Sequence, residues 1–137
     1  MRIMGLDLGE KRVGVALSDE LGITAGPLTV LNRRPHQTFL QTVTDLYNEH
    51  DVQKIVIGLP RNMDGSLGPQ AQRVLAMTNE LRKIGLNVDT WDERLSTVAA
   101  ERVLLEADLS RQKRKQVIDK VAAAYILQGY LDSIKTN

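Results

Sequence analysis

Five short apolar segments, and the lengths of chain between them, limit the folds open to this sequence. Residues 2–8 and 13–17 are separated by a short turn, and a third segment falls within residues 23–31. Connections this short join antiparallel strands. Residues 54–59 and 86–91 each follow a stretch long enough to hold a helix, and strands joined through a helix run parallel. The spacing therefore predicts a five-stranded mixed sheet.

Helical periodicity fills the longer connections and the C-terminal part of the chain. Apolar residues from Phe39 to Tyr47 form the stripe of an amphipathic helix, and a second helix is predicted from Pro69 to a stop at Gly85. Two more are predicted near residues 97–107 and 111–134. The element order predicts an α/β fold with helices on the faces of the sheet. That order matches the ribonuclease H-like topology.

Composition agrees with one such unit. A chain of 137 residues that is 42% hydrophobic can bury one core, so residues 1–137 are predicted to form a single domain. The absence of cysteine excludes disulfides, thiolate zinc sites and a cysteine nucleophile, and it suits a reducing cytosol, so we expect a cytoplasmic location. No apolar run is long enough for a signal peptide or a membrane span, so no membrane partner is expected.

Three acidic positions interrupt otherwise apolar elements. Asp7 lies in the first strand, Asp92 and Glu93 end the fifth, and Asp119 lies on the apolar face of the last helix. Each has an ordinary alternative. Asp7 suits a turn cap before Gly9, the acidic pair suits a polar strand exit near a helix start, and Asp119 suits an ion pair with Lys115.

The three acids together favour a metal site, because carboxylates gathered at one sheet edge repel one another unless cations are present. Oxygen donors without histidine or cysteine suit Mg²⁺ or Mn²⁺. Two such ions can stabilise the attacking and leaving oxygens of a phosphodiester. This interpretation predicts a metal-dependent phosphodiesterase.

Two further segments suggest contact with nucleic acid. Residues 110–115 place Arg111, Lys113 and Arg114 at a helix N-terminus, where an anion would offset the positive charge, although a solvated charged junction is the alternative. The loop of residues 60–65 offers backbone amides for a phosphate, with Asn62 as a candidate contact, or else a turn held by Asn62 and Asp64.

Other enzyme classes have less support in the sequence. The glycine-rich opening resembles the phosphate-binding hairpin of actin-like ATPases, but those enzymes hold nucleotide between two domains of this type. Neither a G-x-S-x-G motif nor a Walker loop is present. A small ATPase therefore stays a minor alternative.

Four ordered sequence blocks resemble the YqgF family of pre-16S rRNA nucleases, also described as RuvX-type Holliday junction resolvases. The blocks are Gly5-Leu6-Asp7-Leu8-Gly9 with Gly14-Val15-Ala16, Val56 to Gly65, Asp92 to Thr97, and Arg111-Gln112-Lys113 followed by Asp119 to Leu127. The resemblance covers nearly the whole chain. It implies a ribonuclease H-like fold, an acidic metal site, a cytoplasmic location and a nuclease role in maturing the 5′ end of small-subunit ribosomal RNA.

One departure affects the choice of catalytic acids. Characterised relatives end the fourth strand with an acid, whereas this strand ends in Gly58-Leu59-Pro60. If the fifth strand lies two places from the first, the gap is roughly 10 Å. The longer side chain of Glu93 suits that gap, and Asp92 is then expected to orient Arg94. We predict Asp7, Glu93 and Asp119 as catalytic residues and metal ligands, with Asp7 shared between two ions.

The sequence is compatible with more than one nucleic-acid substrate and with more than one state of assembly. Precursor rRNA is the favoured substrate, bound through backbone phosphates by Arg94, Lys113 and Arg114. The alternatives are a resolvase that cuts branched DNA as a two-fold dimer and a module that binds RNA without cleaving it. We expect a monomer or a weak homodimer.

Overall fold

A mixed sheet of five strands forms the centre of the computed structural model, which describes residues 1–93 and 111–135, with the backbone alone for 111–118. The strands are β1 (Arg2–Leu8), β2 (Arg12–Ser18), β3 (Ala25–Asn32), β4 (Val52–Leu59) and β5 (Val88–Asp92). Their order across the sheet is β3-β2-β1-β4-β5. β2 is antiparallel to β1 and β3, whereas β4 is parallel to β1 and β5. The predicted mixed sheet is confirmed.

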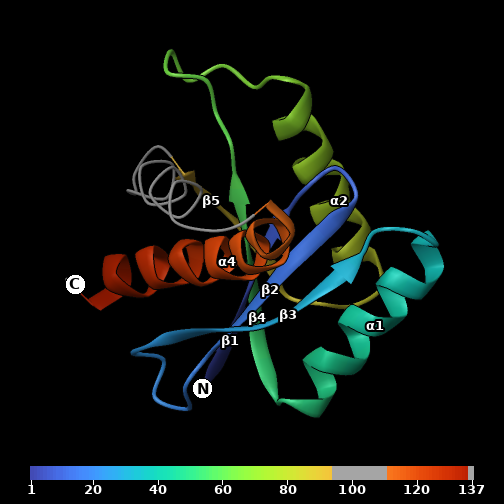
Figure 1. Cartoon of the computed structure of the whole chain (residues 1–137). Coiled ribbons are helices and arrows are strands. Elements are labelled where there is room, and N and C mark those ends of the chain that lie inside the picture. Colours follow the sequence, from blue (N-terminus) through green and yellow to red (C-terminus); the bar gives the residue numbers. More distant parts are fainter. Residues whose placement is uncertain (94–110, 136–137) are drawn as a thin grey trace.

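Helices cover both faces of this sheet (Figure 1). The described helices are α1 (His36–Glu49), α2 (Pro69–Lys83) and α4 (Arg111–Lys135). α1 and α2 pack on one face and α4 crosses the other (Figure 1). The helix predicted near residues 97–107 lies outside the described residues. In the part of the chain that the structure describes, no helix has the length and apolar character needed to cross a membrane.

Alternation along β1 separates two hydrophobic clusters. Met4, Leu6 and Leu8 belong to the larger cluster, which includes buried side chains of α1 and α2. Ile3 packs in the second cluster with α4 residues. Because side chains in a strand alternate between faces, Asp7 lies on the α4 face. That face carries the candidate chemistry.

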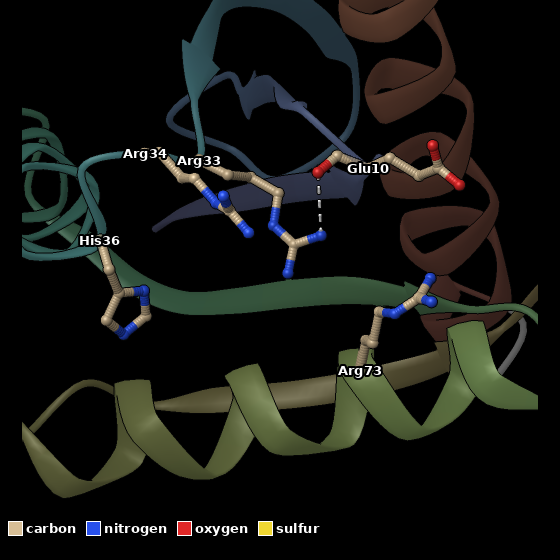
Figure 2. A pocket seen from close by; sticks show the side chains of 5 residues that line it. All are labelled: Glu10, Arg33, Arg34, His36 and Arg73. Carbon is tan, nitrogen blue, oxygen red and sulfur yellow. Dashed lines mark hydrogen bonds between the residues drawn. The ribbon is translucent and has the colours of Figure 1, made fainter.

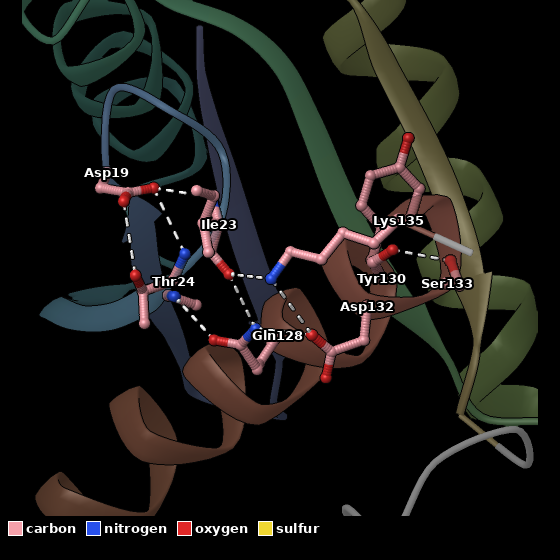
Figure 3. Close-up of polar contacts among 9 residues, drawn as sticks. Asp19, Ile23, Thr24, Gln128, Tyr130, Asp132, Ser133 and Lys135 are labelled. Carbon is pink, nitrogen blue, oxygen red and sulfur yellow. Dashed lines mark hydrogen bonds and ion pairs between the residues drawn. The ribbon is translucent and has the colours of Figure 1, made fainter. Parts of the chain in front are cut away.

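The C-terminal half of α4 is attached to the loop between β2 and β3 by polar contacts (Figure 3). The Gln128 side chain accepts a hydrogen bond from Ala25 N at 2.9 Å and donates one to the Ile23 carbonyl at 3.0 Å. Lys135 Nζ also donates to the Ile23 carbonyl, at 3.1 Å. Within the loop, the Ile23 N–H donates to Asp19 and lowers the pKa of that carboxyl. These contacts fix where α4 crosses the sheet.

Candidate active site

Asp7 lies between two glycines on neighbouring strands. In the antiparallel pair, Asp7 is opposite Gly14 of β2. In the parallel pair, Leu6 is opposite Ile57, which places Asp7 beside Gly58 of β4. The Asp7 side chain is half-buried rather than fully enclosed. The two glycines leave space on either side of it that larger residues would fill.

Glu93 occupies the space above Gly58. It follows the last residue of β5, and β5 lies two places from β1, as the sequence predicts. A Cβ built on Gly58 would lie 2.8 Å from Glu93 Oε1. The Glu93 carboxylate therefore takes the position that a side chain from β4 would otherwise fill, next to Asp7.

Asp119 approaches Asp7 from the opposite side, over Gly14. A Cβ on Gly14 would lie 1.8 Å from the backbone oxygen of Asp119, so α4 can pack this closely only against glycine. The Asp119 carboxylate pairs with Arg12 of β2, with 3.3 Å between Arg12 Nε and Asp119 Oδ2. The ion pair that the sequence suggested for Asp119, with Lys115, involves a side chain outside the described part.

These three acids line one cavity of about 520 Å³, together with Glu10. Its wall also includes the start of α2, where Gln70 Nε2 donates to the Leu8 carbonyl at 2.6 Å, and Arg73 of the same helix. The donors are carboxylate oxygens, which suit hard divalent cations. Among the described residues, however, no three acidic or histidine side chains are close enough together to hold a metal ion. The donor set fits such an ion, because Mg²⁺ in proteins is usually held by one or two carboxylates together with water.

Asp92 and Asn62 lie elsewhere. Asp92 pairs with Arg61, 3.8 Å from its Nε, and does not line the cavity. The expectation that Asp92 orients Arg94 concerns a residue outside the described part. Asn62 Nδ2 donates to Ser66 Oγ at 2.9 Å, and the Ser66 N–H donates to Asp64 at 2.9 Å. The side chains of Asn62 and Asp64 therefore hold a turn, which was the alternative to a phosphate-binding loop.

The predicted basic cluster lies at the start of α4. Arg111, Lys113 and Arg114 are in its first turn, where the structure describes the backbone alone. Sequence reasoning missed Arg12, Glu10 and Arg73 as neighbours of the acids. The hairpin pairing could have indicated Arg12, because it begins the strand that pairs with β1. Arg73 carries no such signal in the sequence.

Comparisons with known proteins agree with the fold and with the family. The RuvX family model, described as "Holliday junction resolvase", matches residues 1–133. A protein of Moorella thermoacetica named "Putative pre-16S rRNA nuclease" is 59% identical, over 100% of this chain and 99% of its own. A protein of the same name from Desulforamulus reducens is 54% identical, over 97% of this chain and 98% of its own.

Solved structures of two resolvases share the fold. T. thermophilus RuvC in complex with a Holliday junction substrate has a TM-score of 0.59 at 13% identity, over 100% of this chain and 97% of that chain. The fowlpox virus Holliday junction resolvase has a TM-score of 0.54 at 14% identity, over 98% of this chain and 99% of that chain.

The sheet order and the crossing of α4 over one face of the sheet are those of a ribonuclease H-like fold, which the resolvase structures share. The chain belongs to the RuvX (YqgF) family, as the match over residues 1–133 shows. Its enzyme class is accordingly that of nucleases, which hydrolyse phosphodiester bonds in nucleic acid.

Proposed function

We propose that this chain is a metal-dependent nuclease that processes the 5′ end of precursor 16S rRNA, with Asp7, Glu93 and Asp119 as its catalytic carboxylates. The observation that supports it most is the placement of Glu93 over Gly58 and of Asp119 over Gly14, on either side of Asp7. Three acids from three elements thereby line one cavity. The names of the curated relatives support the RNA substrate.

In this proposal the carboxylates supply the negative charge that holds two Mg²⁺ or Mn²⁺ ions. Asp7 would contribute oxygen ligands to both ions, and Glu93 and Asp119 would each contribute to one. Bound ions lower the pKa of an attacking water and stabilise charge on the leaving oxygen. Arg12 pairs with Asp119 and so holds that carboxylate at the cavity until a cation competes for it. Arg94, Lys113 and Arg114 contact backbone phosphates without reading bases.

A Holliday junction resolvase is the second candidate, and the description of the family model favours it. A resolvase places two nicks related by two-fold symmetry, so it acts as a dimer. The rRNA nuclease acts as a monomer or a weak homodimer.

Parallel cleavage assays separate the candidates. Purified protein is incubated with precursor small-subunit rRNA and with a four-way DNA junction, in Mg²⁺, Mn²⁺ or chelator, and Asp7→Asn is the inactive control. Metal-dependent cleavage of the RNA by wild type alone supports the proposal. Paired nicks in the junction without RNA cleavage would support the resolvase. RNA binding that no metal converts into cleavage would indicate a binding module.

A further inference from the structure

A second cavity lies beside the acidic one and is lined mainly by arginines (Figure 2). Its volume is about 460 Å³, and its lining residues are Glu10, Arg33, Arg34, His36 and Arg73. We call it the arginine pocket. Arg33 and Arg34 follow β3, Arg73 lies in the second turn of α2, and Glu10 lies in the turn between β1 and β2. Two separate parts of the fold, the segment after β3 and helix α2, therefore bring guanidinium groups to one cavity.

The positive charge of this pocket is not neutralised within the described part of the chain. Arg33 Nη1 donates to the backbone carbonyls of Gly9 at 2.9 Å and Glu10 at 3.3 Å. Arg73 Nη1 donates to Gln70 Oε1 at 2.9 Å. These acceptors are uncharged, and among the described residues no carboxylate forms an ion pair with Arg33, Arg34 or Arg73. A bound anion would reduce the repulsion among the three guanidinium groups.

Two of the acidic side chains that the structure describes lie near the pocket, Glu10 and Glu80, and neither forms an ion pair with its arginines. Glu10 contributes its backbone carbonyl, and Figure 2 shows its carboxylate extending away from Arg33. Glu80 pairs with His36, with 2.8 Å between Glu80 Oε2 and His36 Nε2. Helix α1 also begins at His36 without a side-chain cap, so its positive N-terminal end adds to the potential there.

The arginine pocket and the acidic cavity share walls. Glu10 and Arg73 line both of them. Gly9 lines the acidic cavity, and its carbonyl accepts the hydrogen bond from Arg33. A phosphodiester held at the carboxylates would therefore have the next phosphates of its strand beside these guanidinium groups. Arginine suits that ligand because its planar donors match the oxygens of a phosphate.

We propose that the arginine pocket binds backbone phosphates of the substrate strand next to the phosphodiester at the acidic cavity. This inference rests on the proposed nuclease function and assigns to Arg34 and Arg73 a role in positioning the strand. Contacts of this kind fix the register of the strand and carry no sequence preference. The ligand is the charged backbone of the strand rather than a terminal phosphate.

The test measures binding without cleavage. A labelled RNA hairpin with a single-stranded 5′ tail ending in a hydroxyl is titrated in chelator at several salt concentrations, and binding is followed by fluorescence anisotropy. We expect Arg34→Gln and Arg73→Gln each to flatten the slope of log affinity against log salt by about 0.7–0.9. Affinity should fall roughly fivefold to tenfold at low salt for each variant, because one phosphate contact is lost. Melting temperatures should stay at the wild-type value, since both side chains are exposed.

Lys83→Gln is the matched control. Lys83 is an exposed cation on α2, about 15 Å along the helix from Arg73, and it lines neither cavity. It should keep the wild-type slope. Unchanged slopes in Arg34→Gln and Arg73→Gln, or an equal loss in Lys83→Gln, would overturn the inference.

Two further arms make the result specific. A probe with a 5′ phosphate should show the same losses, and an effect confined to that probe would overturn the assignment to backbone phosphates. An RNA whose tail carries neutral methylphosphonate linkages should bind wild type more weakly. Its affinity should not change in Arg34→Gln or Arg73→Gln. If the slopes change as expected but wild type cleaves no RNA with Mg²⁺ or Mn²⁺, the pocket assignment stands and the nuclease proposal fails.

Discussion

At the scale of single residues, the missing side chain of Gly58 is as much a part of the candidate site as the carboxylates. An added Cβ would lie 2.8 Å from Glu93 Oε1 and 2.7 Å from Ile126 Cδ1. Both atoms end flexible side chains, so they can move without unfolding the protein. The substitution Gly58→Ala should therefore displace the Glu93 carboxylate while changing the stability of the fold only slightly.

We expect Gly58→Ala to lower the free energy of unfolding by about 1 kcal/mol, as mild overpacking does. Displacement of the Glu93 carboxylate should lower nuclease activity much more, by roughly 100-fold. Thermal melts and cleavage rates measured on the same preparation give the comparison. Gly26→Ala in β3 is the control, because a Cβ there meets nothing within 4 Å. Activity that falls only in proportion to stability would argue against a catalytic role for Glu93.

A second residue-scale prediction concerns the ion pair between β4 and β5. Lys54 Nζ lies 2.6 Å from Asp89 Oδ2. Hydrogen bonding to Lys54 lowers the pKa of Asp89 below 3.8, and bonding to Asp89 raises the pKa of Lys54 above 10.5. Asp89 therefore stabilises the fold at pH values above its pKa in the unfolded chain. This stabilisation is lost as pH falls through its lowered pKa in the folded protein. Lys54 adds stability below its unfolded pKa and loses it as pH rises through the raised value.

Asp89→Asn should accordingly destabilise the protein most between about pH 5 and pH 10. We expect a difference of about 0.5–1 kcal/mol there, because both side chains are partly exposed to solvent. Chemical denaturation of both proteins across this range measures it, and the difference should shrink in 1 M salt. A difference that is independent of pH would show that the pair contributes through packing instead.

At the scale of elements, the docking of α4 depends on Gly14. Its position against the Asp119 carbonyl leaves no room for a methyl group, and backbone cannot move aside as a side chain can. Gly14→Ala should cost about 3 kcal/mol or more. The melting temperature should fall by roughly 10 °C, whereas Gly26→Ala should leave it unchanged. A mild effect of Gly14→Ala would mean that α4 can tilt away from β2.

The elements themselves were largely predictable from the sequence. Apolar runs and helical stripes give all five strands and the described helices, with ends that differ by a few residues. Periodicity reports which side chains face a core, and that information is local. The preference for Glu93 over Asp92 came instead from the expected strand order and from side-chain length, which limit the acids that can reach β1.

The polar surroundings of the acids were not predictable in the same way. Arg12 reaches Asp119 because β2 pairs with β1, and Arg73 lines the cavity because α2 packs beside it. Asn62 was expected to contact a phosphate, but its side chain donates a hydrogen bond to Ser66 that holds a turn. Such pairings depend on tertiary geometry that one sequence does not encode locally.

At the scale of the whole molecule, binding of a cation should change global stability. Asp7→Asn removes one of the three carboxylates that line the acidic cavity and keeps the side-chain volume, so stability without metal should stay level or rise. In wild type, Mn²⁺ at 100-fold above its dissociation constant should add about 2.7 kcal/mol. That gain should largely vanish in Asp7→Asn, together with nuclease activity.

Thermal melts of wild type, Asp7→Asn and Asp7→Ala, each with and without Mn²⁺, give the measurement. If Asp7 instead caps the turn at Gly9, Asp7→Ala should cost about 1 kcal/mol and Asp7→Asn much less. A rise in melting temperature on adding Mn²⁺ that persists in both variants would exclude Asp7 as a ligand.

Glu93 places its carboxylate over Gly58 of β4, although it follows β5 in the sequence. The position of this acid in the chain therefore differs from its position in space. An alignment that compares strands one by one would score the C-terminal end of β4 as lacking a carboxylate. A superposition of atomic positions would find one there, supplied by the residue after β5. Templates for finding such sites should therefore be written as points around Asp7, with the supplying strand left free.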